Sequence, residues 1–137
     1  MTHVSRSIEF SASASDVWAH IGGFQDLADW HPAVQGSAKE ESGGVEHRRL
    51  DLGGGASIFE KSLGSDGTSY AYEILDPGPL PITSYRGTLS VAPSSKGSVV
   101  SWSATFEPAG APEADAAGAV SGIYEAGFAA LSEKFVG

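Results

Sequence analysis

A long series of strand-like segments, followed by one long helix, constrains the fold of this chain more than any other feature. Six such segments lie at 34–41, 45–52, 56–64, 68–75, 83–92 and 98–107. Short turns that contain glycine separate most of them, and glycine supplies the positive φ that tight hairpins need. The connection at 76–82 is different, because its prolines cannot join a ladder and predict a stiff rim instead. Consecutive hairpins of this kind predict an antiparallel sheet.

The C-terminal stretch predicts an amphipathic helix over 113–135. Its apolar residues recur at steps of three and four, at Val120, Ile123, Tyr124, Phe128, Leu131 and Phe135. Such a helix is roughly 33 Å long at 1.5 Å per residue, enough to cross a domain of this size. A sheet of hairpins has one apolar face, and we expect this helix to cover it. Gly118, Gly122 and Gly127 on the helix predict either close contact with the sheet or room for a ligand.

The N-terminal part predicts one strand and two short helices. Residues 4–10 alternate between apolar and polar, as in a half-buried strand. Ser13 is placed to cap a first helix, which the glycine pair at 22–23 ends. A further helical turn is predicted at 25–29, before Pro32. The predicted fold class is therefore α+β: a seven-stranded curved antiparallel sheet, two short helices after the first strand, and a long C-terminal helix packed across the sheet.

Composition restricts the partners of the chain. Its 137 residues are 41% hydrophobic and 18% charged, which is typical of one globular domain spanning 1–137. Eight Lys and Arg against 17 Asp and Glu give a net charge of −9, so we expect no nucleic acid partner and no membrane insertion. The chain has no cysteine, which excludes disulfides and thiolate metal sites. No apolar run is typical of a signal peptide or a membrane span, and a cytoplasmic location is expected.

Several local strings are similar to those of a known superfamily. They are IEF at 8–10 leading into ASDVW at 14–18, DWHP at 29–32, PLP at 79–81, YRGT at 85–88 and GIYEAG at 122–127. With this order of elements, the chain resembles the START-like helix-grip (SRPBCC) superfamily, in particular its polyketide cyclase/dehydrase and lipid-transport branch. The resemblance implies a cavity between the sheet and the C-terminal helix. It implies no shared catalytic residue.

Strand pairing predicts which side chains line that cavity. A turn at 53–55 places Arg48 opposite Glu60 and Leu50 opposite Ile58 on one face. A loop at 65–67 then places Tyr72 opposite Glu60 and Ile74 opposite Ile58. Together with the last hairpin and the two helical regions, the expected ligand-binding residues are Trp30, Arg48, Leu50, Ile58, Glu60, Tyr70, Tyr72, Ile74, Tyr85, Leu89, Trp102, Phe106, Tyr124 and Phe128.

Arg48 and Glu60 are the only charged pair on this apolar face, and two interpretations stay open. Mostly apolar walls with a few converging polar groups are usual for a small-molecule site, so the pair could orient a ligand together with the Tyr72 hydroxyl. The pair could equally satisfy itself, since a buried ion pair often adds little net stability.

His31 also allows two interpretations. Its ordinary pKa suits an acid or a base at the mouth of a pocket, but we expect a solvated side chain. Trp30 beside it either closes one end of the pocket or packs under the short helices. No His, Asp or Glu set has the spacing of metal ligands, so no metal and no cofactor are expected.

Three functions fit these residues. The first is binding of a small hydrophobic molecule such as a lipid, a polyketide or an aromatic metabolite. The second is an enzyme of cyclase or dehydratase type, in which Arg48 and Tyr72 polarise a carbonyl while Glu60 removes a proton. The third is a protein-interaction module with a filled core. The oligomeric state is not predicted.

Overall fold

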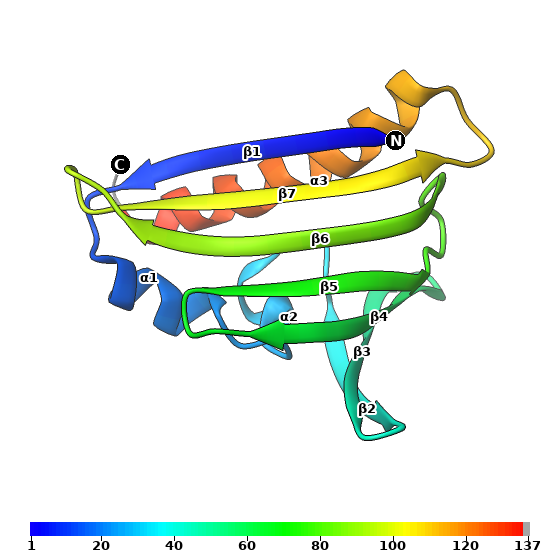
Figure 1. Cartoon of the computed structure of the whole chain (residues 1–137), viewed down its shortest axis with the longest axis horizontal. Coiled ribbons are helices and arrows are strands. Elements are labelled where there is room, and N and C mark those ends of the chain that lie inside the picture. The colour runs from blue at the N-terminus through cyan, green and yellow to red at the C-terminus, as the bar shows by residue number, and fades with distance from the viewer. Residues whose placement is uncertain (136–137) are drawn as a thin grey trace.

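A computed structural model describes residues 1–135 and contains one seven-stranded antiparallel sheet, as predicted (Figure 1). The strands are β1 (Thr2–Phe10), β2 (Gly36–Ser42), β3 (Val45–Gly53), β4 (Ala56–Ser65), β5 (Ser69–Asp76), β6 (Ile82–Pro93) and β7 (Ser98–Pro108). Their spatial order is β1-β7-β6-β5-β4-β3-β2, so β1 and β2 are the two edges of an open sheet. In Figure 1, β2 and β3 run steeply across the direction of β6 and β7, because the sheet is strongly twisted and curved.

Three helices complete the predicted helix-grip fold. α1 (Ala14–Ile21) and α2 (Leu27–Trp30) follow β1, and α3 (Glu113–Lys134) follows β7. α3 runs along β1 and β7 behind the sheet in Figure 1. Ser13 caps α1 as predicted, since its Oγ accepts a hydrogen bond from the Asp16 backbone N–H at 3.2 Å.

The first predicted hairpin register is confirmed. Arg48 pairs with Glu60 and Leu50 pairs with Ile58 across β3 and β4. All four side chains are buried, so the predicted inner face of this hairpin is the face that meets the core.

The second predicted register is wrong by two residues. Glu60 pairs with Ile74 rather than with Tyr72, and Tyr72 pairs with Ser62, so Ile58 does not lie opposite Ile74. The register shifts between Ser62 and Gly64, and the turn is longer than the predicted loop, because Ser65 already pairs with Tyr70. A shift of two residues keeps each side chain on its face, whereas a shift of one would reverse it.

A bulge in β6 keeps two apolar residues on the same side. The register shifts between Thr83 and Arg86, and Ser84 there has a φ of 56°. Thr83 and Ser84 are both exposed, while Ile82 and Tyr85 on either side of them are both buried. The bulge therefore directs the Tyr85 side chain into the interior.

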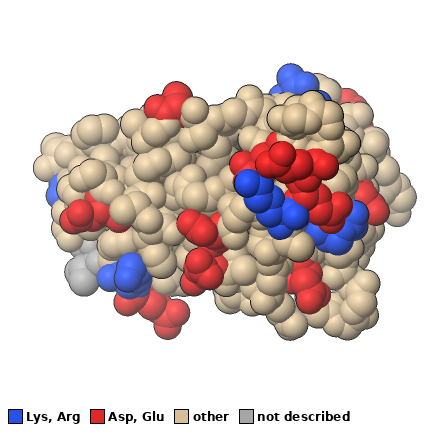
Figure 2. Space-filling view, turned by 90° about the horizontal axis from the view of Figure 1, so that it is seen from below, with Lys and Arg blue, Asp and Glu red and all other residues tan. Residues whose placement is uncertain are grey.

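The surface carries mixed charge. On the face shown in Figure 2, Lys and Arg side chains lie beside Asp and Glu side chains. Exposed ion pairs of this kind join Arg49 to Glu40 at 3.0 Å and Arg86 to Glu73 at 3.3 Å. Within residues 1–135, no helix is both long and apolar enough to cross a membrane.

Candidate ligand-binding cavity

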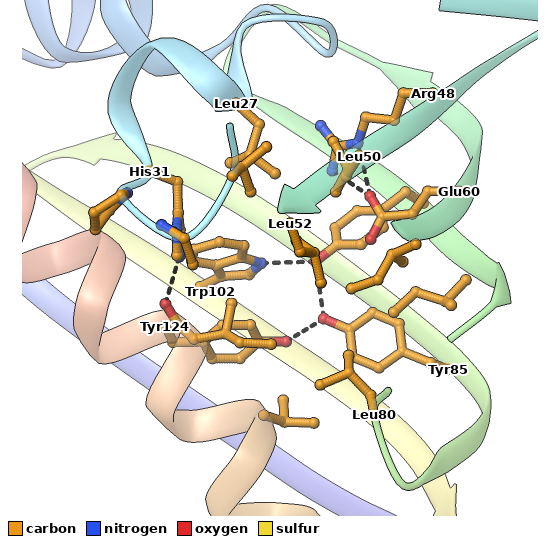
Figure 3. A pocket seen from close by; sticks show the side chains of 18 of the residues that line it. Leu27, His31, Arg48, Leu50, Leu52, Glu60, Leu80, Tyr85, Trp102 and Tyr124 are labelled. Atoms are coloured by element: carbon orange, nitrogen blue, oxygen red, sulfur yellow. Dashed lines mark hydrogen bonds and ion pairs between the residues drawn. The ribbon is translucent and has the colours of Figure 1, made fainter. Parts of the chain in front are cut away.

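A cavity of about 370 Å³ lies between the sheet, α3 and the segment that follows α2 (Figure 3). This volume lies within the range of roughly 300–1,000 Å³ that small-molecule sites occupy. The lining residues are Leu27, His31, Pro32, Ala33, Val34 and Gln35 from α2 and the segment after it, Arg48, Leu50, Leu52, Ile58, Glu60, Tyr72, Ile74, Tyr85 and Trp102 from the strands, Leu80 from the proline-rich rim, and Val120, Ile123 and Tyr124 from α3. Most of the wall is therefore apolar.

The structure brings together nine of the fourteen residues that the sequence analysis selected. They are Arg48, Leu50, Ile58, Glu60, Tyr72, Ile74, Tyr85, Trp102 and Tyr124. The other five, Trp30, Tyr70, Leu89, Phe106 and Phe128, are buried but do not line the cavity. Two of these aromatic rings support the wall from behind: the Trp30 ring lies 5.7 Å from that of Trp102, and the Phe106 ring lies 6.2 Å from that of Tyr85.

Sequence reasoning missed several lining residues. Val120 and Ile123 belong to the predicted apolar stripe of the helix, which was the signal that could have identified them. Leu80 lies in the proline-rich rim, where strand pairing gives no information about direction. Leu27 and Gln35 come from α2 and the segment after it, whose path depends on tertiary contacts.

The Arg48 guanidinium is held from several directions. Its Nε donates a hydrogen bond to Glu60 Oε1 at 2.7 Å, and its Nη2 lies 2.7 Å from the same oxygen. Nη1 donates to the backbone carbonyl of Phe24 at 2.6 Å, in the loop between α1 and α2. The guanidinium carbon also lies 4.1 Å from the centre of the Phe24 ring and 5.1 Å from that of Tyr72. Arg48 thus fastens the α1–α2 loop to the sheet.

Burial affects the two charges of this pair differently. Burial raises the pKa of the Glu60 carboxyl, and the Arg48 guanidinium opposes that rise. Burial alone would lower the pKa of Arg48, but the Glu60 carboxylate together with Tyr70 and Tyr72 outweighs it and keeps the pKa above its ordinary value. Both side chains line the cavity, but Arg48 is 0% exposed and Glu60 is 6% exposed, so the carboxylate is the more accessible member of the pair.

Three tyrosines and one tryptophan form a hydrogen-bonded chain across the cavity wall (Figure 3). Trp102 Nε1 donates to the Tyr72 hydroxyl at 2.9 Å, and the Tyr72 and Tyr85 hydroxyls lie 2.8 Å apart. The Tyr85 hydroxyl in turn bonds that of Tyr124, which α3 supplies. Burial raises the pKa of all three tyrosines above the ordinary value, so they are neutral hydroxyl groups at neutral pH.

Gly87 makes room for this chain on β6. A Cβ at position 87 would lie 2.8 Å from the Tyr85 hydroxyl oxygen and 3.1 Å from Tyr72 Cζ. Any larger residue at this position would displace the two rings that carry the hydroxyls.

His31 is buried and lines the cavity, so the expectation of a solvated side chain is wrong. Its Nε2 lies 2.7 Å from the Ile123 carbonyl, and its Nδ1 accepts a hydrogen bond from the Ala33 backbone N–H at 3.1 Å. An acceptor at Nδ1 assigns the proton to Nε2, which donates it to Ile123. Burial lowers the pKa of His31, and the bond to Ile123 opposes this. Both ring nitrogens are thus occupied by protein groups, and the ring connects the segment after α2 to α3.

The absence of a side chain at Gly127 lets α3 approach α2 closely. A Cβ at this position would lie 3.0 Å from His31 Cδ2, 3.0 Å from Trp30 Cζ3 and 3.2 Å from Trp102 Cζ3. Gly118 and Gly122 have open space instead, and nothing in the structure explains them.

The chemistry available in the cavity is that of one carboxylate, one guanidinium behind it and three neutral phenols. Among residues 1–135, no three His, Asp or Glu side chains group as metal ligands. The phenols can donate hydrogen bonds to an oxygen, and the carboxylate can accept one.

The family model described as "Polyketide cyclase / dehydrase and lipid transport" matches residues 1–136. Among solved structures, the protein XoxI from Bacillus cereus is 34% identical, with a TM-score of 0.91 over 99% of this chain and 96% of that chain. No sequence among the curated proteins matches the chain.

Two enzymes have similar folds at lower identity. The Zhui aromatase/cyclase from Streptomyces sp. R1128 is 19% identical, with a TM-score of 0.65 over 94% of this chain and 87% of that chain. Norcoclaurine synthase from Thalictrum flavum, solved with dopamine and hydroxybenzaldehyde, is 22% identical, with a TM-score of 0.69 over 96% of this chain and 84% of that chain. At these identities the likeness concerns the fold.

Proposed function

The chain belongs to the polyketide cyclase/dehydrase and lipid-transport family, and on that premise we propose that its cavity binds one small, mainly apolar molecule. The observation that carries the proposal is the cavity of about 370 Å³ between the sheet and α3. A dry cavity of about 150 Å³ is enough to bind benzene, so this one offers roughly 2.5 times that space. A molecule of one or two rings fits this volume.

A filled core, as an interaction module would need, is hard to reconcile with such a volume. Well-packed interiors hold few voids larger than a water molecule. The wall is mostly apolar and carries a few polar groups, which is the arrangement of a ligand site rather than of a packing defect.

Catalysis on the bound molecule is the second candidate, and the position of Glu60 favours it. The carboxylate reaches the cavity, and its burial raises its pKa, which strengthens it as a base for a carbon-bound proton. The neutral tyrosine hydroxyls would stabilise the oxyanion that forms when this proton leaves. Glu60→Gln would abolish turnover of such a substrate, whereas retained turnover would remove Glu60 as the base.

Binding is tested by filling the cavity. Ile123 lines it and is half-buried, so Ile123→Trp would place an indole in the space that the ligand needs. Ala129 on the same helix is exposed, and Ala129→Trp is the matched control. Protein-observed NMR titration with naphthalene should show saturable binding to the wild type and to Ala129→Trp, and at least tenfold weaker binding to Ile123→Trp. Equal affinity for all three proteins would contradict the proposal.

A further inference from the structure

One oxygen of Glu60 remains available to a ligand. Both Arg48 contacts end on Oε1, and no hydrogen bond within residues 1–135 reaches Oε2. Trp30 Nε1 and Arg48 Nη2 are the only side-chain polar atoms of this part of the chain that are sealed from solvent without a hydrogen bond. Because Oε2 is not one of them and Glu60 lines the cavity, this oxygen is exposed to the cavity. It is an acceptor without a donor.

The hydroxyl chain has one proton more than it has well-aligned hydrogen bonds. Trp102 donates a hydrogen bond from its N–H to the Tyr72 hydroxyl. The other two hydrogen bonds of the chain join the hydroxyls of Tyr72, Tyr85 and Tyr124. Two of the three hydroxyl protons make these bonds, and the third has only a weaker contact between Tyr72 and Tyr124 to accept it, so a ligand oxygen can compete for this proton. It resides on Tyr72, Tyr85 or Tyr124 according to the direction of the bonds, and all three residues line the cavity. The wall therefore offers one donor whose position adapts.

These two features lie within electrostatic reach of each other. The negative charge of Glu60 is one of the causes that raise the pKa of Tyr72 and Tyr124. A ligand hydroxyl between them would donate a hydrogen bond to Glu60 Oε2. It would accept a hydrogen bond from the tyrosine hydroxyl that carries the spare proton. One group would thereby satisfy both unpaired positions.

The charge of the cavity wall excludes an anion. Arg48 lines the cavity but is 0% exposed and already paired with Glu60, so the more accessible charged group that a ligand meets is the carboxylate. A ligand carboxylate would be buried next to a like charge without a countercharge, which is strongly unfavourable.

We infer that the cavity selects a neutral molecule of one or two rings that carries a hydroxyl group, and that it rejects a carboxylate of the same size. This inference rests on the proposed function, because it names the chemical class of the molecule that the same cavity binds. Glu60 acts as the specificity-determining residue, and Arg48 positions its carboxylate.

Four naphthalene derivatives of similar size test the inference by calorimetric or NMR titration of the wild-type protein at neutral pH. Naphthalene measures apolar binding alone, and 2-methoxynaphthalene adds an acceptor without a donor. 2-Naphthol has both a donor and an acceptor, and 2-naphthoate carries a negative charge. We expect 2-naphthol to bind at least about tenfold more tightly than naphthalene and 2-methoxynaphthalene, the factor that a hydrogen bond to a charged acceptor typically gives. We expect 2-naphthoate to bind more weakly than naphthalene.

The results separate the two proposals. Binding of naphthalene without any advantage for 2-naphthol, or 2-naphthoate binding as tightly as 2-naphthol, would overturn the inference and leave the proposed function standing. Failure of all four compounds to bind would overturn both.

Glu60→Gln provides a second test, with Glu73→Gln on the outer face as control. The glutamine amide would present a donor where Oε2 presents an acceptor, and Arg48 would lose its countercharge. We expect the preference for 2-naphthol to disappear and the affinity for 2-naphthoate to rise above that of naphthalene, while Glu73→Gln keeps the wild-type ranking. A wild-type ranking in Glu60→Gln would overturn the inference. The wild-type titrations decide it even where Glu60→Gln does not fold.

Discussion

Arg48 and Glu60 meet through a single carboxylate oxygen, because Arg48 Nε and Nη2 both lie 2.7 Å from Glu60 Oε1. This geometry combines the two interpretations that the sequence left open. The pair satisfies itself through Oε1, and it leaves Oε2 exposed to the cavity. Arg48 also donates to the Phe24 carbonyl, so one side chain lines the cavity and fixes the α1–α2 loop to the sheet.

Replacing Arg48 should destabilise the fold strongly. Arg48→Met leaves the Glu60 charge buried without its partner, and losing one member of a buried pair typically costs about 3–5 kcal/mol. Chemical denaturation measures the free energy of unfolding. The double variant Arg48→Met with Glu60→Met should recover most of the loss, and Arg86→Met, in an exposed pair with Glu73, should change stability by less than about 1 kcal/mol. A loss in Arg48→Met no larger than in Arg86→Met would show that the buried pair does not hold the fold.

Loss of the middle hydroxyl of the tyrosine chain should lower the stability of the fold. Tyr85→Phe removes both hydrogen bonds of that hydroxyl and leaves those of Tyr72 and Tyr124 without it, at an expected cost of about 1–3 kcal/mol. Tyr70→Phe is the matched control, since the Tyr70 hydroxyl only accepts a long bond of 3.4 Å from Arg48. Thermal and chemical unfolding should rank Tyr85→Phe as the less stable variant. The reverse ranking would disprove the importance of the chain.

Two helix glycines should respond to alanine in opposite directions. Gly127→Ala forces a methyl group to within about 3 Å of the rings of Trp30 and His31, and overpacking of this kind typically costs about 1–3 kcal/mol. Gly122→Ala meets open space on an exposed helix position, so it should stabilise the protein by up to about 1 kcal/mol. The melting temperatures of the two variants provide the comparison, and a stabilised Gly127→Ala would contradict the close packing.

His31 should make the fold less stable at mildly acidic pH. Burial lowers its pKa in the folded state below the ordinary value of 6.5, so the unfolded chain binds the proton more readily. Stability that is fully present well above pH 6.5 is then lost as the pH falls below it, toward the folded-state pKa. Urea denaturation between pH 5 and pH 8 should show this slope, which the conservative variant His31→Gln should reduce.

The pKa of His20 is also lowered by burial, although His20 is more accessible. We therefore expect His20→Gln to reduce the slope less than His31→Gln. An unchanged slope in His31→Gln would mean that another group causes the loss of stability.

The fold and the inner face of the sheet could be predicted from the sequence because both follow from local patterns. Apolar alternation assigns a face to each strand, and glycine turns locate the hairpins. The pairing of Arg48 with Glu60 follows from these two signals alone. The β4–β5 register does not, because neither the irregularity near Gly64 nor the longer turn leaves a clear mark on the sequence.

The sequence could not predict in the same way which inward-facing side chains reach the cavity and which pack behind its wall. Phe106 and Tyr85 lie on the same predicted face, yet Phe106 packs behind Tyr85 and does not reach the cavity. The burial of His31 depends on α3, which approaches its ring at Gly127 more than ninety residues later in the chain. Periodicity indicates the side of an element, whereas the layer that a side chain occupies depends on how distant elements pack.

A crystal structure of the protein grown with 2-naphthol would show whether the space between the sheet and α3 holds a small molecule. We expect the two rings to lie among Ile58, Trp102 and Tyr124, with the naphthol oxygen within hydrogen-bond distance of Glu60 Oε2 and of a tyrosine hydroxyl. A cavity occupied only by water, or closed by its own side chains while 2-naphthol binds elsewhere, would contradict this expectation.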